Sequence, residues 1–199
     1  MSSPIDPDKL LRQARALAGI GAGRGRPSPT NHRRAVSAAY YALFHSLCLH
    51  AAEYMLPATA PPDEAHRATR WFNHKDIRGV CEIVADCAAV TTPVSGRPKK
   101  VGLSAEPLWL ALSSPSGAGR VSVVPPELAF VVDAFLTLRN ARHAADYDHL
   151  AAFPKATTAG HVKDAEEAVS ILKARAADPI FQRFFAWIVA RATGFNRQR

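Results

Sequence analysis

The stretch LAFVVDAFLTLRNARHAADYDH, residues 128–149, decides how the fold is interpreted. Its first half is apolar, and its second half combines arginines, histidines, acids and a tyrosine. In an α-helix, steps of three and four residues return to the same face. One such face carries Leu128, Val131, Phe135, Leu138, Arg142, Ala145 and His149. Because lone charges are costly in apolar surroundings, we expect the polar end of this stripe to open into a cleft or an interface.

The composition is that of a basic globular protein. The chain has 199 residues, which suits one domain, or one domain with a large insertion. Hydrophobic residues make up 48% of the chain, enough to form a core. The net charge of +8 favours anionic partners, of which nucleic acid is the commonest. The alternative is a basic surface without such a partner.

The cysteines and the hydropathy bound the location. Cys48, Cys81 and Cys87 lie in apolar helical contexts, and an odd, scattered set argues against a disulfide framework. We expect three buried thiols in a reducing cytoplasm. The N-terminus has no apolar signal core, and no apolar run reaches the about 18 residues of a membrane span. We therefore expect no membrane partner. The histidines do not cluster at metal-ligand spacing, so we expect no metal, and we expect no other cofactor.

The first half of the chain predicts helices. One begins at Asp6-Pro7, a cap followed by proline, and a basic linker over residues 21–27 follows it. A second helix covers Asn31 to Met55. Residues Asp63 to Ala89 form either one helix or two helices with a kink near Asn73-His74.

The second half begins differently. Residues 90–125 are rich in proline, glycine and serine and predict an irregular insertion that could include a short hairpin. A third helix starts at Pro126, a fourth covers Thr158 to Ala177, and another runs from Asp178-Pro179 to Thr193, capped by Gly194. The core residues expected on the five helical segments after the first are Val36, Tyr40, Leu43, Phe44 and Leu47; Trp71, Ile77, Val80, Cys81, Val84 and Cys87; the apolar part of the stripe above; Val162, Ala165, Val169 and Leu172; and Phe181, Phe184, Phe185 and Ile188.

These elements predict an all-α fold. We expect a single domain over residues 1–199, built as an up-and-down four-helix bundle with an irregular insertion and an extra C-terminal helix in residues 178–199. The pair Glu166-Glu167 is expected on a solvated helix face.

Two segments resemble one known family. Residues 33–45, RRAVSAAYYALFH, resemble the second-helix signature of HEPN domains (higher eukaryotes and prokaryotes nucleotide-binding), and residues 139–149 resemble a later HEPN helix. In that family an arginine, a polar residue and a following histidine form a ribonuclease signature, matched here by Arg142, His143 and His149. Residues 73–76 also look like those of uncharacterised bacterial members. The resemblance covers roughly residues 6–177, except 90–125.

The resemblance implies a helical bundle that often dimerises. It also implies metal-independent RNA cleavage in toxin–antitoxin or other defence systems. Such cleavage uses the 2′-hydroxyl of the RNA, a proton acceptor and donor, and a cation for the phosphate. Histidine suits the proton transfers and arginine suits the phosphate. We therefore assign His149 as general base or acid, Arg142 as phosphate clamp and His143 as a secondary polar group. A dimer would supply a second histidine.

Six further residues are candidates for binding phosphate, RNA or another ligand. They are Arg139, Asp146 and Tyr147 beside Arg142, and Arg34, Tyr41 and His45, which share a polar stripe on the second helix with Ser37. Each has a structural alternative. Arg142 and Asp146, four residues apart, could form only a surface ion pair. Tyr147 could anchor the helix end, His149 could be an exposed turn residue, and the stripe on the second helix could be a polar edge.

Three hypotheses result from the sequence. The first is a metal-independent RNA endonuclease that acts as a homodimer, with an antitoxin protein as a partner. The second is a non-catalytic module that binds a nucleotide, RNA or a partner protein. The third is an interaction protein that pairs through an apolar surface such as the phenylalanines of residues 181–188.

Overall fold

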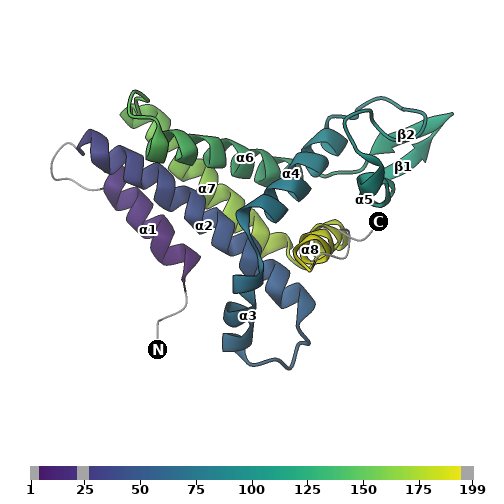
Figure 1. Ribbon diagram of the computed structural model, residues 1–199, viewed down its shortest axis with the longest axis horizontal. Helices are drawn as coiled ribbons and strands as arrows, with labels where there is room; N and C mark the ends of the chain where they lie inside the picture. The colour runs from purple at the N-terminus through teal and green to yellow at the C-terminus, as the bar shows by residue number, and fades with distance from the viewer. Residues whose placement is uncertain (1–4, 22–26, 194–199) are drawn as a thin grey trace. The chain divides into compact units, whose positions relative to one another are not determined.

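The computed structural model describes residues 5–21 and 27–193 (Figure 1). The chain divides into two compact units. One is made of Met1–Cys48 and Ala134–Ala174, and the other of Leu49–Asp133 and Arg175–Arg199.

As the sequence predicted, the fold is an all-α helical bundle fold. Within residues 5–21 and 27–193, the strands are limited to one antiparallel hairpin. The elements in chain order are α1 (Pro7–Ala18), α2 (Pro29–Met55), α3 (Pro62–Ala68), the 3-10 turn η1 (Thr69–Trp71), α4 (His74–Ala88), the 3-10 turn η2 (Leu103–Ala105), α5 (Glu106–Ala111), β1 (Ser113–Ser116), β2 (Gly119–Ser122), α6 (Pro126–Tyr147), α7 (Lys155–Arg175) and α8 (Pro179–Ala192).

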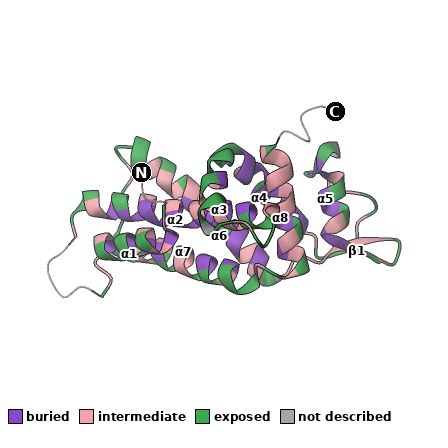
Figure 2. Cartoon of the chain, turned by 90° about the horizontal axis from the view of Figure 1, so that it is seen from below, coloured by how far each residue is buried: buried purple, intermediate pink, exposed green. Residues whose placement is uncertain are grey.

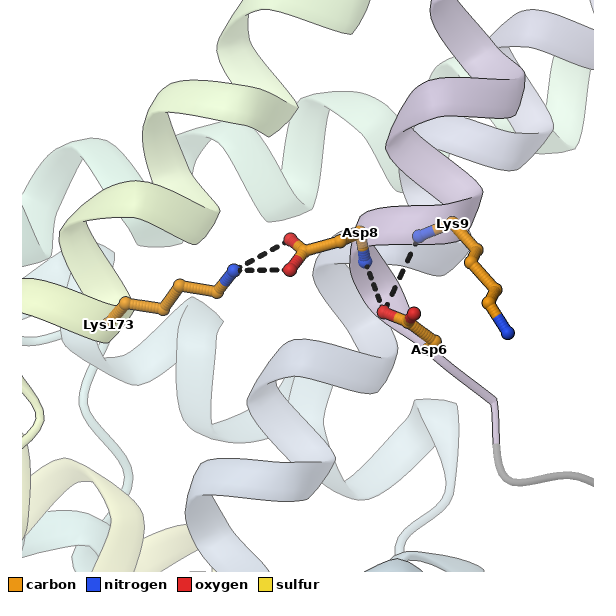
Figure 3. A network of polar contacts seen from close by, with 4 residues as sticks. All are labelled: Asp6, Asp8, Lys9 and Lys173. Atoms are coloured by element: carbon orange, nitrogen blue, oxygen red, sulfur yellow. Dashed lines mark hydrogen bonds and ion pairs between the residues drawn. The ribbon is translucent and has the colours of Figure 1, made fainter.

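Helix α1 begins and ends at residues suited to helix caps. The Asp6 carboxylate accepts hydrogen bonds from the backbone amides of Asp8, at 2.9 Å, and Lys9, at 3.4 Å (Figure 3). This confirms the predicted start at Asp6-Pro7. Gly19 ends the helix with a left-handed φ of 69°, a conformation that glycine adopts without strain. The helix therefore ends before the predicted basic linker, of which residues 22–26 lie outside the described part.

Helix α1 packs against α7 in the first unit. Lys173 Nζ lies 2.6 and 2.8 Å from the carboxylate oxygens of Asp8 (Figure 3). Arg15 Nη1 lies 2.8 Å from Glu166 Oε1. Both pairs are solvent-accessible, so each contributes only about 0–1 kcal/mol. The predicted solvated face of Glu166-Glu167 is present, since Glu167 is exposed and Glu166 forms a solvent-accessible pair with Arg15.

The apolar faces supply most of the packing in this unit. In Figure 2, buried and exposed segments alternate along α1 and α7, as expected of helices with one inner face. The core residues predicted for α2 and α7 are buried, and so are Phe135 and Leu138 of the 128–149 stripe. Leu128 and Val131 of that stripe are also buried but belong to the second unit. The rings of Tyr40 and Phe135 have centroids 5.6 Å apart and join α2 to α6. Helix α7 starts three residues before the predicted Thr158.

The second unit contains the predicted break near Asn73. The Asn73 side chain caps α4 by accepting a 2.9 Å hydrogen bond from the Asp76 amide. The core residues predicted on α4, from Ile77 to Cys87, are buried. The prediction that Trp71 lies in the core is wrong, since it is 62% exposed and Phe72 is buried in its place. The 3-10 turn η1 has a tighter period than an α-helix, so it shifts which residue faces inward.

Helix α8 belongs to the same unit and packs on α4. Its four predicted core residues, from Phe181 to Ile188, are buried. They therefore form core and not an exposed pairing surface, the role our third hypothesis gave them. The predicted cap Gly194 lies outside the described residues.

The segment of residues 90–125 is more ordered than predicted. The possible hairpin is present as β1 and β2, with Ser113 opposite Ser122 and Ser116 opposite Gly119. The apolar run of residues 108–112 lies mostly in the short helix α5. Gly119 is required here because a Cβ atom would lie 2.6 Å from the Val94 carbonyl oxygen, with which this hairpin makes a further bridge.

Candidate functional site

Arg142 occupies the centre of a polar cluster in the first unit. Its Nη2 donates a 2.9 Å hydrogen bond to the Tyr41 hydroxyl, and its Nε lies 2.6 Å from Asp146 Oδ2. The guanidinium carbon lies 5.5 Å from the centroid of the Tyr41 ring and 5.6 Å from that of Tyr147. Arg142 therefore makes both the ion pair of the structural alternative and contacts to two predicted ligand-binding tyrosines.

The charge of this arginine is retained. Partial burial lowers the pKa of Arg142, but the neighbouring Tyr41 and Asp146 more than offset that effect and raise the pKa above its ordinary value. The same arginine acts against the rise that burial causes in the pKa of Tyr40 on the core side of α2. The cluster therefore contains a permanent cation that is three-quarters covered by protein.

Asp146 connects α6 to α2. Its Oδ1 accepts a 2.8 Å hydrogen bond from Ser37 Oγ while its Oδ2 pairs with Arg142. Ser37 and Tyr41 lie one turn apart on α2, so the polar stripe of α2 does face the end of α6. His45 lies a further turn along and stacks on Tyr41, with ring centroids 6.2 Å apart.

Arg33 holds the end of α6 in place. Its guanidinium donates to the carbonyl oxygens of Ala145 at 2.9 Å, Asp148 at 2.9 Å, His149 at 3.3 Å and Ala151 at 2.6 Å. Ala145 belongs to the last turn of α6 and the other three residues follow the helix, a place where helical partners for carbonyls are missing and the dipole favours a cation. Sequence reasoning gave Arg33 no role. Its place in the quoted motif was a signal, but no pattern in one sequence shows that an arginine binds carbonyls about 115 residues away.

The position of His149 differs from the prediction. Helix α6 ends at Tyr147, and His149 lies in an exposed turn two residues later. Asp148 helps to form that turn, because its carboxylate accepts a 2.9 Å hydrogen bond from the Leu150 amide. His149 therefore does not extend the helical stripe of Arg142. Among the described residues, no hydrogen bond or ion pair joins its imidazole to Arg142.

The remaining candidates lie around this cluster. His143 is exposed on α6, and its ring centroid lies 5.0 Å from that of Tyr147, which is itself 62% exposed. Arg139 Nη1 donates a 3.1 Å hydrogen bond to the neighbouring Asn140 Oδ1. Arg34 is exposed on α2 and makes no ion pair with any described residue.

A groove of about 620 Å³ lies next to the cluster, within the first unit. Most of its polar lining comes from successive turns of α2, and Asp146 at the end of α6 adds a carboxylate. The α2 residues are Thr30, Arg33, Arg34, Ser37 and Tyr41. Two arginines and one carboxylate give this lining a net positive charge. Tyr41, which accepts a hydrogen bond from Arg142, and Asp146, which forms an ion pair with it, thus both lie in the groove wall.

Comparison with models of known protein families, with curated proteins and with solved structures gave no match. Among residues 5–21 and 27–193, no three histidine, cysteine, aspartate or glutamate side chains are grouped as metal ligands would be. In the same residues, no helix combines the length and the apolar character that crossing a membrane requires.

Proposed function

We propose that the groove between α2 and the end of α6 binds a phosphate-bearing ligand, a nucleotide or a single-stranded RNA. The observation that carries this proposal is the groove lining itself. Arg34 lines the groove and has no ion-pair partner among the described residues. Tyr41 and Asp146, which also line the groove, hold the Arg142 guanidinium next to it. Arginine donates two parallel hydrogen bonds to a phosphate, and the net charge of +8 attracts anions from a distance.

Asp146 is the competitor of a ligand for Arg142, because its carboxylate pairs with the Arg142 guanidinium. A phosphate that enters from the Arg34 side competes with Asp146 for the same donors. Ser37, which already donates to Asp146, can hold that carboxylate while Arg142 turns to the ligand. The arrangement suits reversible binding.

The resemblance of residues 33–45 and 139–149 to HEPN helices supports RNA as the ligand. We propose RNA as the ligand on this ground. We also propose that the protein assembles into a homodimer and acts in the cytoplasm. On the HEPN interpretation, the favoured function is the non-catalytic one. No histidine is among the described residues that line the groove, and His149 lies in the turn beyond α6.

An endoribonuclease is the second candidate, and one contact favours it. Arg33 donates to the carbonyl of His149 at 3.3 Å, so the turn that carries the histidine is tied to the helix that lines the groove. In a homodimer, two such turns could provide the base and the acid of a metal-independent cleavage, with an antitoxin protein as the regulator of the toxin.

Binding is tested with a fluorescein-labelled single-stranded RNA and fluorescence anisotropy. Arg34→Gln should weaken binding and reduce the slope of log K against log salt by about one, as expected when one phosphate contact is lost. Arg70→Gln is the matched control, because Arg70 is equally exposed and lies in the second unit. Unchanged binding by Arg34→Gln, or an equal loss in both variants, would contradict the proposal.

Cleavage is tested separately with the same RNA in the presence of a chelator. The second candidate predicts cleavage by the wild-type protein that His149→Ala abolishes while RNA binding remains. If RNA stays intact after incubation with the dimeric wild-type protein across a range of pH, the endoribonuclease candidate is refuted. Binding is then the remaining function.

A further inference from the structure

The second unit contains a cavity of its own. It has a volume of about 300 Å³ and lies between α4, residues 104–105 and the last turns of α8. This volume is at the lower end of the range for small-molecule sites in proteins. A ligand that fills it is therefore a small metabolite and not a polymer.

One wall of the cavity depends on a close approach of two helices. Gly79 on α4 faces Arg191 on α8, and a Cβ atom on Gly79 would lie 2.9 Å from the guanidinium carbon of Arg191. The missing side chain lets the guanidinium lie against the backbone of α4. Arg191 is thus held at the cavity wall, half-buried, by the shape of the facing helix.

Among the described residues, the lining contains two cations and one carboxylate. Lys75 and Arg191 make no ion pair with any residue in the described part of the chain. Asp76, the carboxylate, is only 4% exposed and accepts a 2.5 Å hydrogen bond from Asn73 Nδ2. The charges of these described side chains sum to one positive unit, and the N-terminus of α4 adds a partial positive charge beside Lys75.

The rest of the described lining is mainly apolar. Trp187 contributes an indole that is half-buried, and Ile83 contributes an aliphatic side chain. Ser104 adds one hydroxyl at the rim. A ligand with an apolar, planar body would bury that body against Trp187 while its charged end meets the two cations.

We propose that this cavity binds a small aromatic carboxylate. The planar fork of Arg191 matches the two oxygens of a carboxylate. The single negative charge of a carboxylate matches the net positive charge of the described lining. A phosphate dianion carries one negative charge more than this lining balances, and the Asp76 carboxylate would repel it. The ring of the ligand packs on Trp187 and Ile83.

The test uses benzoate and indole-3-acetate, with the full-length protein and ligand-observed NMR titration. We expect saturable binding of both carboxylates, about ten-fold weaker binding of the uncharged isostere benzamide, and weaker binding of inorganic phosphate than of benzoate. Equal binding of benzoate and benzamide, tighter binding of phosphate, or no saturable binding of either carboxylate would overturn the proposal.

Variants locate the binding in this cavity. Arg191→Met should weaken benzoate binding about ten-fold, and Arg191→Lys by less, because the charge remains while the fork is lost. Arg183→Met on the exposed side of α8 is the matched control and should bind as the wild type does. Lys75→Met, at an exposed position, should weaken binding about three-fold. Weaker benzoate binding by Lys75→Met would locate the ligand in this cavity even if Arg191→Met does not fold. Wild-type affinity for benzoate in both variants would refute the site.

This inference is independent of the proposed RNA site. Arg34→Gln, which should weaken RNA binding, is expected to leave benzoate binding unchanged. Gly79→Ala should weaken benzoate binding and leave RNA binding unchanged, since its Cβ atom displaces the Arg191 guanidinium. A parallel loss of both activities in either variant would contradict two separate sites.

Discussion

Arg142 is held by two kinds of neighbour, and they have different consequences for its chemistry. The neutral Tyr41 hydroxyl positions the guanidinium without cancelling its charge. The Asp146 carboxylate positions it and also competes with any incoming anion. One residue, Asp146, therefore sets how strongly this arginine can attract a phosphate.

The first prediction concerns that competition. Asp146→Asn keeps the shape of the side chain and removes its negative charge, so RNA affinity should rise about five-fold, the value of one partly exposed charge contact. Anisotropy titration with the labelled RNA measures the change. Asp133→Asn, at an exposed position on the same helix, makes the same change in net charge and should have a much smaller effect. An equal gain in both variants would mean that only the overall charge matters.

A second prediction at this scale concerns Tyr41. Tyr41→Phe removes the hydroxyl that accepts from Arg142 and keeps the ring beneath the guanidinium. RNA affinity should fall about two- to five-fold because Arg142 is less well positioned, while the free energy of unfolding changes by about 1 kcal/mol or less. Tyr54→Phe, which alters an exposed tyrosine of the second unit, serves as the control. An unchanged affinity would remove Arg142 from the binding site.

The end of α6 and the turn after it are held by one side chain. Arg33 donates to the carbonyl oxygens of Ala145, Asp148 and Ala151, and the Asp148 oxygen also accepts one backbone hydrogen bond, from the Ala151 amide. Arg33→Met keeps the length of the side chain but leaves these oxygens to water. The free energy of unfolding should fall by about 1–3 kcal/mol, measured by urea denaturation. Arg34→Met changes the exposed neighbouring arginine and should cost less than about 0.5 kcal/mol.

Periodicity determined how much of these elements could be predicted. The inner faces of α2, α4, α7 and α8 were correct, because buried residues repeat every three to four positions along a long helix. Trp71 was placed wrongly because a 3-10 turn has a different period. His149 was placed on a helix that ends at Tyr147, since an ideal helix drawn through a sequence has no end. The short α5 was missed because six residues give fewer than two turns of pattern.

The site was predicted to a similar extent and for similar reasons. The pairing of Arg142 with Asp146 is local and could be expected from their spacing on one helix. The contacts of Arg142 with Tyr41, and of Ser37 with Asp146, join residues more than 100 positions apart. The family resemblance brought both segments to attention, but only the packing of α2 on α6 shows which side chains meet.

At the scale of the whole molecule, the three cysteines are distributed over both units, so their reactivity measures the opening of each unit. Cys48 belongs to the first unit, and Cys81 and Cys87 belong to the second. All three are free and buried, as the sequence predicted. Burial raises the pKa of Cys48 and Cys81 far above the ordinary value of a thiol and raises the pKa of Cys87 to about 12.

These raised pKa values make stability depend on alkaline pH. An unfolded thiol has a pKa of about 8.5, so above that pH the unfolded chain loses protons that the folded chain keeps. The unfolded state then binds fewer protons, and the free energy of unfolding falls as pH rises from about 8.5 towards the folded pKa values. Below pH 8 the stabilisation is fully present. Each thiol should account for roughly 1 kcal/mol between pH 8 and pH 9.5.

The last prediction combines this linkage with chemical labelling. Urea denaturation at pH 7.5 and pH 9.5 should show the loss in the wild-type protein, and a smaller loss in Cys87→Ala, which removes one of the three linked groups. In parallel, pulsed alkylation at pH 8 with mass spectrometry should leave all three thiols of the folded protein unmodified, since each lies in a core and holds its proton. Labelling at Cys48 reports opening of the first unit, and labelling at Cys81 and Cys87 reports opening of the second. Rapid alkylation of any of these cysteines without denaturant, or a free energy of unfolding that does not change over this pH range, would contradict the buried, protonated state of the thiols in the two cores.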